Sequence, residues 1–477
     1  MPTSLLWLRR DLRIADNPAL LAAAGQLGGT GGPATAQPDS APDVLPVYVL
    51  DPRLWSPSGD RRRAHLVASL RLLGERLGGM LLLAGDPVVL LPQLAREVAA
   101  DQVHAAADVG PYGRDRDERL AAALAADGRV LMRTGSPYAV APGRVRKGDG
   151  EPYRVFTPFR RAWLDHGWRA PAPEPQGLRV MVPRASGALR AAQREAEAML
   201  EAAAATGEVS GAGELAALER WAQFLDGPIA RYEEDRNRPD RDGTSQLSVA
   251  LKWGEVHPRT LLADLAPLAQ QAETTEGAAS LRSELGWREF LADVLWHQPD
   301  SARTSMKPAV PESSWVTGRA EQEALEAWQA GRTGYPIVDA GMRQLARTGW
   351  MHGRVRMIVA SFLVKDLHVR WQRGARYFMT QLHDADLASN QHNWQWVAGS
   401  GTDAAPFFRV FNPVRQGERF DPDGAYVRRW VPELAEVQGK AAHQPWPQGG
   451  PRGYPAPIVD HDVERKVALA AHQERPR

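Results

Sequence analysis

Glu284, Trp287 and Arg288 combine an acid, an indole and a guanidinium within the segment 283–300. On a helix, residues at i, i+3 and i+4 lie on one face, so these three side chains would point the same way. Such a face can stack a planar ring on the indole and hydrogen-bond the edge of that ring. It can equally be a solvated helix surface, and the pattern alone leaves both interpretations open.

Three hydroxyls, those of Thr244, Ser245 and Ser248, stand just before a predicted helix in the segment GTSQLSVALKW. Hydroxyls and free backbone N–H groups at the start of a helix can bind phosphate. The same residue types are common N-caps, and capping is the simpler interpretation of this pattern alone. The chain has no P-loop motif, so phosphate binding of that kind is not expected.

Trp394 and Trp396 stand two positions apart in the segment NQHNWQWVAGSGTDAAP, which covers 390–406. Side chains at i and i+2 on a helix point about 200° apart. The two indoles therefore cannot share one face of the helix, and we expect them to have separate tasks.

Arg354 and Arg356 lie beside an apolar stripe in the segment 349–371. An arginine next to such a stripe usually has a carboxylate partner, because burial of an unpaired charge is costly. Asp384 and Asp386 follow in HDADLASN. Two acids this close can also form a turn or bind a metal. No histidine at ligand spacing, no HExxH motif and no EF-hand pattern accompanies them, so we expect no metal site.

The elements that would position these groups fall into three parts. Short apolar runs alternate with helical patterns at the beginning of the chain, which is typical of βαβ units with a parallel sheet. The expected strands cover 4–8, 44–51, 80–85, 103–109 and 130–135. We predict an α/β domain over 1–135, an interdomain connector over 136–212 and an all-helical domain over 213–477.

The composition narrows the class of protein. A chain of 477 residues with 43% hydrophobic and 24% charged residues is typical of a globular protein with more than one domain. The absence of cysteine excludes disulfides and thiolate metal sites. A net charge of +1 means that nucleic-acid binding would need a local basic patch.

Arg9 and Arg10 precede any long apolar run, and the longest such run, 357–364, is too short to cross a bilayer. We therefore expect neither a signal peptide nor a membrane segment.

Taken together, these segments resemble the photolyase/cryptochrome flavoproteins, and most of all the class I photolyases that repair cyclobutane pyrimidine dimers. In family order along nearly the whole chain, the matching segments are LLWLRRDLRIADNPAL, GTSQLS, WREF, GRTGYPIVDAGMRQLARTGWMH, RMIVASFLVKDL, DADLASN, WQWVAGSGTDAAPFFRVFNP and RRWVPEL. The resemblance implies an N-terminal Rossmann-like domain that holds an antenna chromophore (a folate, a deazaflavin or a second flavin) and a C-terminal helical domain that holds FAD. It also implies that reduced FADH⁻, excited by light, gives an electron to a dimer flipped out of damaged DNA and regains it when the dimer splits.

The resemblance assigns the flavin contacts as well. Asn390 would face flavin N5, where the amide oxygen can accept from N5–H and favour the reduced forms. Plant cryptochromes usually have an acid at this position and animal ones a cysteine, so Asn390 favours repair. Arg356 and Asp384 would pair beside the isoalloxazine ring. The whole set implied for FAD is Tyr232, Thr244, Ser245, Leu247, Ser248, Arg288, Arg356, Asp384, Asp386 and Asn390.

The residues implied for the dimer pocket are Glu284, Trp287, Met357 and Trp396. Trp287 and Trp396 would stack on and wedge the flipped bases, while Glu284 would hydrogen-bond the edge of the dimer. Met357 stands where (6-4) photolyases would have a second histidine, which disfavours that substrate. Phosphate contacts, which give affinity independent of sequence, are implied for Arg236, Arg354 and Arg409.

Trp394 and Trp371 match the two inner members of a tryptophan chain that reduces the photoexcited flavin. Counted back from Trp328, the outermost position falls on Gly318, so we expect the nearest indole, Trp315, to take that role.

The chain departs from the family pattern at Gly353, where related enzymes usually have an asparagine that touches both flavin and lesion. One polar contact is therefore expected to be missing.

Two other functions compete with dimer repair. A blue-light receptor on the same fold is disfavoured by Asn390, Glu284 and the Trp287/Trp396 pair. A flavin-free helical DNA-binding protein would be colourless, so yellow or blue material would exclude it. We expect a monomeric, cytoplasmic deoxyribodipyrimidine photo-lyase that acts on damaged DNA independently of sequence.

Overall fold

The computed structural model describes residues 3–27, 42–205, 209, 211–402 and 408–474. The chain forms two compact units whose segments interleave along the sequence. Unit 1 comprises Met1–Pro152, Phe159–Asp226 and Ser245–Pro299, and unit 2 comprises Tyr153–Pro158, Gly227–Thr244 and Asp300–Arg477. The segment Ser245–Pro299 thus belongs to the same unit as the N-terminal segment. As a division into functional domains, the boundaries 1–135, 136–212 and 213–477 stay a prediction.

Unit 1 contains a five-stranded sheet in the order β3-β2-β1-β4-β5, and every strand pair in it is parallel. The strands are β1 (Thr3–Leu8), β2 (Asp43–Leu50), β3 (Leu81–Ala84), β4 (Gln102–Ala105) and β5 (Val130–Arg133). The predicted α/β fold with a parallel sheet is therefore confirmed. Strand β4 ends earlier than the expected range 103–109.

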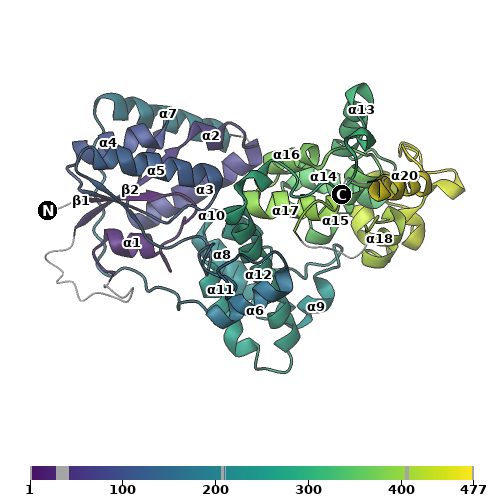
Figure 1. Ribbon diagram of the computed structural model, residues 1–477, viewed down its shortest axis with the longest axis horizontal. Helices are drawn as coiled ribbons and strands as arrows, with labels where there is room; N and C mark the ends of the chain where they lie inside the picture. Colours follow the sequence, from purple (N-terminus) through teal and green to yellow (C-terminus); the bar gives the residue numbers. More distant parts are fainter. Residues whose placement is uncertain (1–2, 28–41, 206–208, 210, 403–407, 475–477) are drawn as a thin grey trace. The chain divides into compact units, whose positions relative to one another are not determined.

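Helices cover both faces of this sheet (Figure 1). Side chains alternate along a strand: Leu5 and Trp7 pack in one core cluster with α4 and α5, and Leu6 and Leu8 in a second with α1 and α3. Helix α7 contributes to both clusters and packs on β3 and α3, although its residues lie in the stretch expected as a connector. These helices are α1 (Pro18–Ala23), α3 (Asp60–Leu77), α4 (Pro87–Glu97), α5 (Pro111–Ala125) and α7 (Gly187–Ala204).

The rest of unit 1 is helical, and its longest helix is α12. Thirteen of the 23 residues of α12 are buried, so fewer than half of its side chains could meet a ligand. The elements are α2 (Pro52–Trp55), α6 (Phe156–His166, whose first residues fall in unit 2), α8 (Glu214–Leu225), α10 (Ser248–Trp253), α11 (Pro258–Leu268) and α12 (Thr275–His297).

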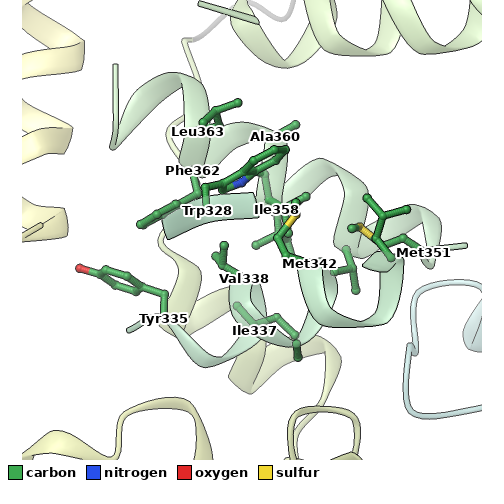
Figure 2. Close-up of a cluster of buried hydrophobic side chains, with 14 of the residues drawn as sticks. Trp328, Tyr335, Ile337, Val338, Met342, Met351, Ile358, Ala360, Phe362 and Leu363 are labelled. Carbon is green, nitrogen blue, oxygen red and sulfur yellow. The ribbon is translucent and has the colours of Figure 1, made fainter. Parts of the chain in front are cut away.

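Unit 2 contains only helices and turns in its described residues. Its core is one large apolar cluster that includes Trp328, Tyr335 and Phe362 (Figure 2). Helix α14 packs on α15 and α19, and α16 packs on α17. The helices are α9 (Tyr232–Asp235), α13 (Gly318–Gln329), α14 (Pro336–Thr348), α15 (Gly353–Lys365), α16 (Trp371–Gln381), α17 (Leu387–Ala398), α18 (Pro413–Phe420), α19 (Ala425–Trp430) and α20 (His461–Gln473). The 3-10 turns are η2 (Pro228–Arg231), η3 (Pro299–Ala302), η4 (Glu312–Ser314), η5 (Pro432–Leu434), η6 (Gly439–His443) and η7 (Trp446–Gln448).

Two searches of the described residues gave negative results. None of their helices combines the length and apolar character that crossing a bilayer requires. Nor do histidine, aspartate and glutamate side chains in these ranges gather in a group able to hold a metal ion.

Candidate functional site

Helix α17 of unit 2 carries Asn390, Trp394 and Trp396. The helix begins where Asp386 Oδ1 accepts from the backbone N–H of Ser389 at 3.0 Å, which satisfies one of the free donors at its N-terminus. It ends at Gly399, whose φ of +78° is the left-handed conformation that favours glycine at a helix end. Asp386, implied for the flavin loop, thus also fixes the start of the helix that presents Asn390.

The two tryptophans of α17 differ in burial, as two faces of a helix should. Trp394 is 3% exposed and Trp396 is half-buried. Trp394 packs edge-on against Phe378, with ring centroids 5.1 Å apart. Gly374 of α16 permits this close approach, because a Cβ on it would lie 2.2 Å from Trp394 Cη2.

The amide group of Asn390 is held in one orientation. Its Nδ2 donates to the carbonyl of Ala375 at 3.0 Å and to Gln391 Oε1 at 2.8 Å. Both amide hydrogens are thereby used, and no donor from the described ranges reaches Oδ1. This leaves a fixed acceptor, which is the group that a reduced flavin with a hydrogen on N5 would need.

Arg356 of α15 forms a two-point ion pair with Asp384. Its Nη1 and Nη2 donate to the two carboxylate oxygens at 3.1 and 2.8 Å, and its Nε donates to the Met351 carbonyl at 2.8 Å. The Asp384 side chain is nearly buried, whereas about a quarter of the Arg356 side chain is exposed. The pairing explains how both charges are tolerated at the edge of the apolar cluster.

Arg354, also on α15, makes different contacts. Its Nε and Nη2 donate to Asn237 Oδ1 at 3.1 and 2.6 Å, and its guanidinium lies 4.5 Å from the centroid of the Phe420 ring. Its Nη1 also lies 3.6 Å from the sulfur of Met357. Arg354, implied for a phosphate contact, and Met357, implied for the dimer pocket, are therefore neighbours.

His352 caps the start of α15. Its Nδ1 accepts from the backbone N–H of Arg354 at 3.1 Å. Burial, together with nearby Arg356 and Arg354, lowers the pKa of His352 to about 4, so the imidazole is neutral near pH 7. Gly353 follows, and a Cβ added there would meet no heavy atom of the described residues within 4 Å. Packing therefore does not require glycine at this position.

Helix α12 of unit 1 presents Glu284, Trp287 and Arg288, all half-buried. The ring of Trp287 packs edge-on against Phe290, with centroids 5.8 Å apart. The three residues do share one helix face, as their spacing predicts.

Arg288 connects α12 to two neighbouring segments of unit 1. Its Nη1 donates to the Pro137 carbonyl at 2.9 Å and its Nη2 to the Leu251 carbonyl at 3.2 Å. The guanidinium also lies 4.3 Å from the centroid of the Tyr138 ring. Arg288 thus fixes the position of α10, in addition to any contact with a ligand.

The segment expected to bind phosphate leads into α10. Ser248 is the first residue of α10 and is exposed, Ser245 is half-buried, and Leu247 is buried at 3% exposure. Neither hydroxyl makes a hydrogen bond to the part of the chain that the structure describes. Gln246 between them has a φ of +51°, an unusual conformation for a residue with a side chain. The two hydroxyls remain available to an anion, and helix capping does not use them.

The residues just before Ser245, from Gly227 to Thr244, belong to unit 2. Tyr232 begins α9 and is 7% exposed, and Arg236 lies over its ring at 5.8 Å. Arg236 also approaches Glu233 at 3.8 Å. Thr244 is half-buried at the end of this stretch of unit 2.

The tryptophans expected to carry electrons all lie in unit 2. Trp371 is buried and donates through Nε1 to Ser305 Oγ at 3.0 Å. Trp315 is partly buried against the main core cluster, and Gly318 begins α13 with a φ of +68°. Trp394 also makes a ring contact with Trp328, at 6.1 Å between centroids. The sequence predicts no role for Trp328, which serves there only as a reference for counting.

Arg409 lies just after the residues that the structure leaves out, and its side chain is exposed. The buried Lys365 donates to its backbone carbonyl. An exposed guanidinium on a tethered backbone is suited to a phosphate contact, as implied for this residue.

Comparison with known proteins places the chain in a family. Residues 280–474 match the family model described as the FAD binding domain of DNA photolyase, and residues 4–176 match the model described as DNA photolyase. A deoxyribodipyrimidine photo-lyase of Agrobacterium fabrum is 38% identical, over 98% of this chain and 97% of that protein.

Solved structures agree with these matches. The chain is similar to a bacterial class III photolyase from Agrobacterium tumefaciens, with a TM-score of 0.85 and 36% identity over 99% of this chain and 97% of that one. It is also similar to an archaeal photolyase from Sulfolobus tokodaii with two FAD molecules, with a TM-score of 0.78 and 26% identity over 99% of each chain. The relatives match nearly the whole chain, and the two family models match its N-terminal and its C-terminal parts. The chain therefore belongs to the DNA photolyase family.

Proposed function

We propose that this chain is a light-driven DNA repair enzyme, a deoxyribodipyrimidine photo-lyase that splits cyclobutane pyrimidine dimers. The observation that carries the proposal is the half-buried pair Glu284 and Trp287 on α12, a helix whose other faces are largely buried. An indole one turn from an acid can stack a flipped base and hydrogen-bond its edge. Near full-length similarity to a photo-lyase supports the same reaction.

The residues that would hold FAD fit the chemistry of that cofactor. The free hydroxyls of Ser245 and Ser248 suit the pyrophosphate, together with Tyr232, Thr244, Leu247 and Arg288 as family contacts. The Arg356–Asp384 pair and Asp386 would lie beside the isoalloxazine ring, and the Asn390 oxygen would accept from N5–H. When bound, FADH⁻ excited by light supplies the electron that opens the dimer and receives it back.

The remaining residues would position the lesion. As the family resemblance implies, Trp396 and Met357 would contact the dimer in addition to Glu284 and Trp287. Arg236, Arg354 and Arg409 would bind phosphates of the DNA backbone. Phosphate contacts give affinity without reading the sequence, which suits an enzyme that must find lesions anywhere.

Electron supply to the flavin would start at Trp394. Its buried position among aromatic rings supports the role of an inner donor, with Trp371 next and Trp315 as the outer member. Indole is readily oxidised, so a row of indoles can pass a positive charge outward.

An antenna chromophore would bind unit 1. A cavity of about 280 Å³ lies beyond the carboxyl ends of β4 and β5 and includes Asp108, Arg133 and Trp296 in its lining. Ligands of open parallel sheets commonly bind at such ends. The similarity to a photolyase with two FAD molecules favours a flavin, and a folate or deazaflavin remains an alternative.

The class within the family is a further part of the proposal. The sequence favours class I, whereas one similar solved structure is a class III photolyase. A monomeric state and a cytoplasmic location are likewise predictions.

An oligonucleotide with a single thymine dimer tests the proposal. The reduced, flavin-loaded protein is expected to remove the dimer under blue light and to leave it intact in the dark. A flavin-loaded protein that leaves the dimer intact in light would favour a blue-light receptor, and a colourless protein would exclude both. Glu284→Gln is expected to slow repair, while Glu323→Gln, an exposed change on α13, serves as the control.

A further inference from the structure

Gln391 and Asn390 form a chain of amide hydrogen bonds that ends on another segment of unit 2. Gln391 Nε2 donates to the Ala302 carbonyl at 2.6 Å. Gln391 Oε1 then accepts from Asn390 Nδ2 at 2.8 Å, and Asn390 Nδ2 also donates to the Ala375 carbonyl at 3.0 Å. Three segments of unit 2 thereby meet at two neighbouring side chains.

Backbone carbonyls determine the orientation of both amides, because a carbonyl can only accept. The Ala302 carbonyl requires the NH2 of Gln391, so the oxygen of Gln391 must face Asn390. That oxygen in turn requires the NH2 of Asn390, and the Ala375 carbonyl makes the same demand independently. A rotation of the Asn390 amide by 180° would place its oxygen against two acceptors and would break both hydrogen bonds.

The Ala302 end of this chain is itself anchored. Gln395 Nε2 donates to the carbonyl of Ser301 at 2.7 Å, and Ser301 Oγ lies 2.9 Å from His392 Nε2. His392 Nδ1 lies 2.7 Å from the Ala388 carbonyl, so Nδ1 carries the hydrogen and Nε2 accepts. Burial lowers the pKa of His392, in agreement with a neutral ring. The acceptor that holds Gln391 is therefore fixed by two further residues of α17.

We propose that Gln391 is a positioning residue that keeps the carbonyl oxygen of Asn390 turned toward the flavin, so that the cofactor meets an acceptor and never a donor. The inference rests on the proposed placement of Asn390 at flavin N5. An acceptor at that position stabilises the reduced form, which has a hydrogen on N5. A rotated amide would offer N–H to the unprotonated N5 and stabilise the oxidised form instead. Gln391 thereby raises the reduction potential of the flavin without touching it.

The test is the two-electron midpoint potential of the bound flavin, measured by redox titration with mediator dyes. Gln391→Met keeps the length of the side chain and removes both hydrogen bonds. Loss of one hydrogen bond changes an equilibrium by about 2- to 10-fold, so the potential is expected to fall by about 10–30 mV. Asn393→Leu is the matched control, because Asn393 is an exposed amide of the same helix and, among the described residues, donates only to the Ser389 carbonyl. Its potential is expected to equal that of the unaltered protein.

Asn390→Leu separates failure of this inference from failure of the proposed function. A lower potential in both Asn390→Leu and Gln391→Met supports the inference. A lower potential in Asn390→Leu alone would show that Asn390 needs no help from Gln391 and would overturn the inference only. An unchanged potential in Asn390→Leu would overturn the placement of Asn390 at N5 and, with it, the inference. Dimer repair is tested separately, because loss of the dimer in light does not depend on which residue faces N5.

Discussion

Trp394 lies edge-on to Trp328, with the ring centroids 6.1 Å apart and the ring planes at 70°. Trp328 is fully buried and donates through Nε1 to the Val359 carbonyl at 3.0 Å. Figure 2 shows its indole among the apolar side chains of α14 and α15. Trp394 is thus part of the aromatic core of unit 2, whereas Trp396, two residues later, is half-buried.

Replacing Trp394 by phenylalanine should separate photoreduction from repair. Trp394→Phe keeps an aromatic ring in the core but removes the easily oxidised indole. We expect photoreduction of oxidised flavin, followed by visible absorption under blue light, to lose most of its rate. Repair by chemically reduced protein should continue, since that reaction does not need the indole. Photoreduction at the normal rate would show that Trp394 is not on the electron path.

The ion pair between Arg356 and Asp384 should contribute to stability. Asp384→Asn keeps the shape of the side chain but leaves the guanidinium without its charge partner. Because about a quarter of the Arg356 side chain is exposed, we expect a loss of about 1–3 kcal/mol in the free energy of unfolding, less than for a fully buried pair. Urea denaturation of the flavin-free protein measures it.

The matched control is Glu323→Gln, the same chemical change in the exposed pair Arg319–Glu323. Exposed pairs contribute little, so we expect a loss of less than about 0.5 kcal/mol. Equal losses in the two variants would contradict a special role for the Arg356–Asp384 pair.

Gly353→Asn should restore the polar contact that the family pattern leads us to expect. A side chain fits there, since a Cβ would lie more than 4 Å from every heavy atom in the part of the chain that the structure describes. One added hydrogen bond is expected to tighten binding of a dimer-containing oligonucleotide by about 2- to 10-fold. Fluorescence anisotropy in the dark measures the Kd, with Gly353→Ala as the control for the loss of glycine. An affinity no better than that of Gly353→Ala would mean that the lesion does not reach this position.

His352 should make the protein less stable in acid. Its pKa is lowered by burial from the ordinary value of 6.5 to about 4, so the unfolded chain binds a proton at a pH where the folded protein does not. The contribution of the neutral His352 to the free energy of unfolding is complete above pH 6.5 and is lost as the pH falls toward 4. At pH 5 the loss is about 2 kcal/mol.

His352→Asn tests this, because an asparagine oxygen can still cap α15 but does not titrate. We expect the fall in unfolding free energy between pH 7 and pH 5 to be smaller in this variant by that amount. A part of the fall should remain, because burial also lowers the pKa of His257 to about 4. An identical pH dependence in both proteins would contradict a neutral, buried His352.

Much of the fold could be predicted from local patterns. Apolar runs separated by helical segments marked all five strands. For β1 to β4 the reason is that a parallel sheet covered on both faces needs strands that are apolar on both sides, whereas β5, at the edge of the sheet, is mostly exposed. The spacing of Glu284, Trp287 and Arg288 placed them on one face of α12, and the two-residue spacing of Trp394 and Trp396 separated a buried from a half-buried indole. Such relations depend only on helix geometry.

The remaining contacts depend on the tertiary fold. The sequence predicts a phosphate contact for Arg354. In the structure its guanidinium also donates hydrogen bonds to Asn237, 117 positions away, which no local pattern indicates. The sequence predicted no role for Gln391, since its role depends on the carbonyl of Ala302, 89 positions away. The spacing of residues along one helix does not predict which backbone carbonyl of another segment will lie next to that helix.

The most direct test of the central claim is the number of thymine dimers removed from an oligonucleotide by flavin-loaded, chemically reduced protein, counted in light and in darkness. Dimer repair predicts that each protein molecule removes many dimers under blue light and none in the dark. Dimers that persist in light, although the protein binds both reduced flavin and the oligonucleotide, would contradict it.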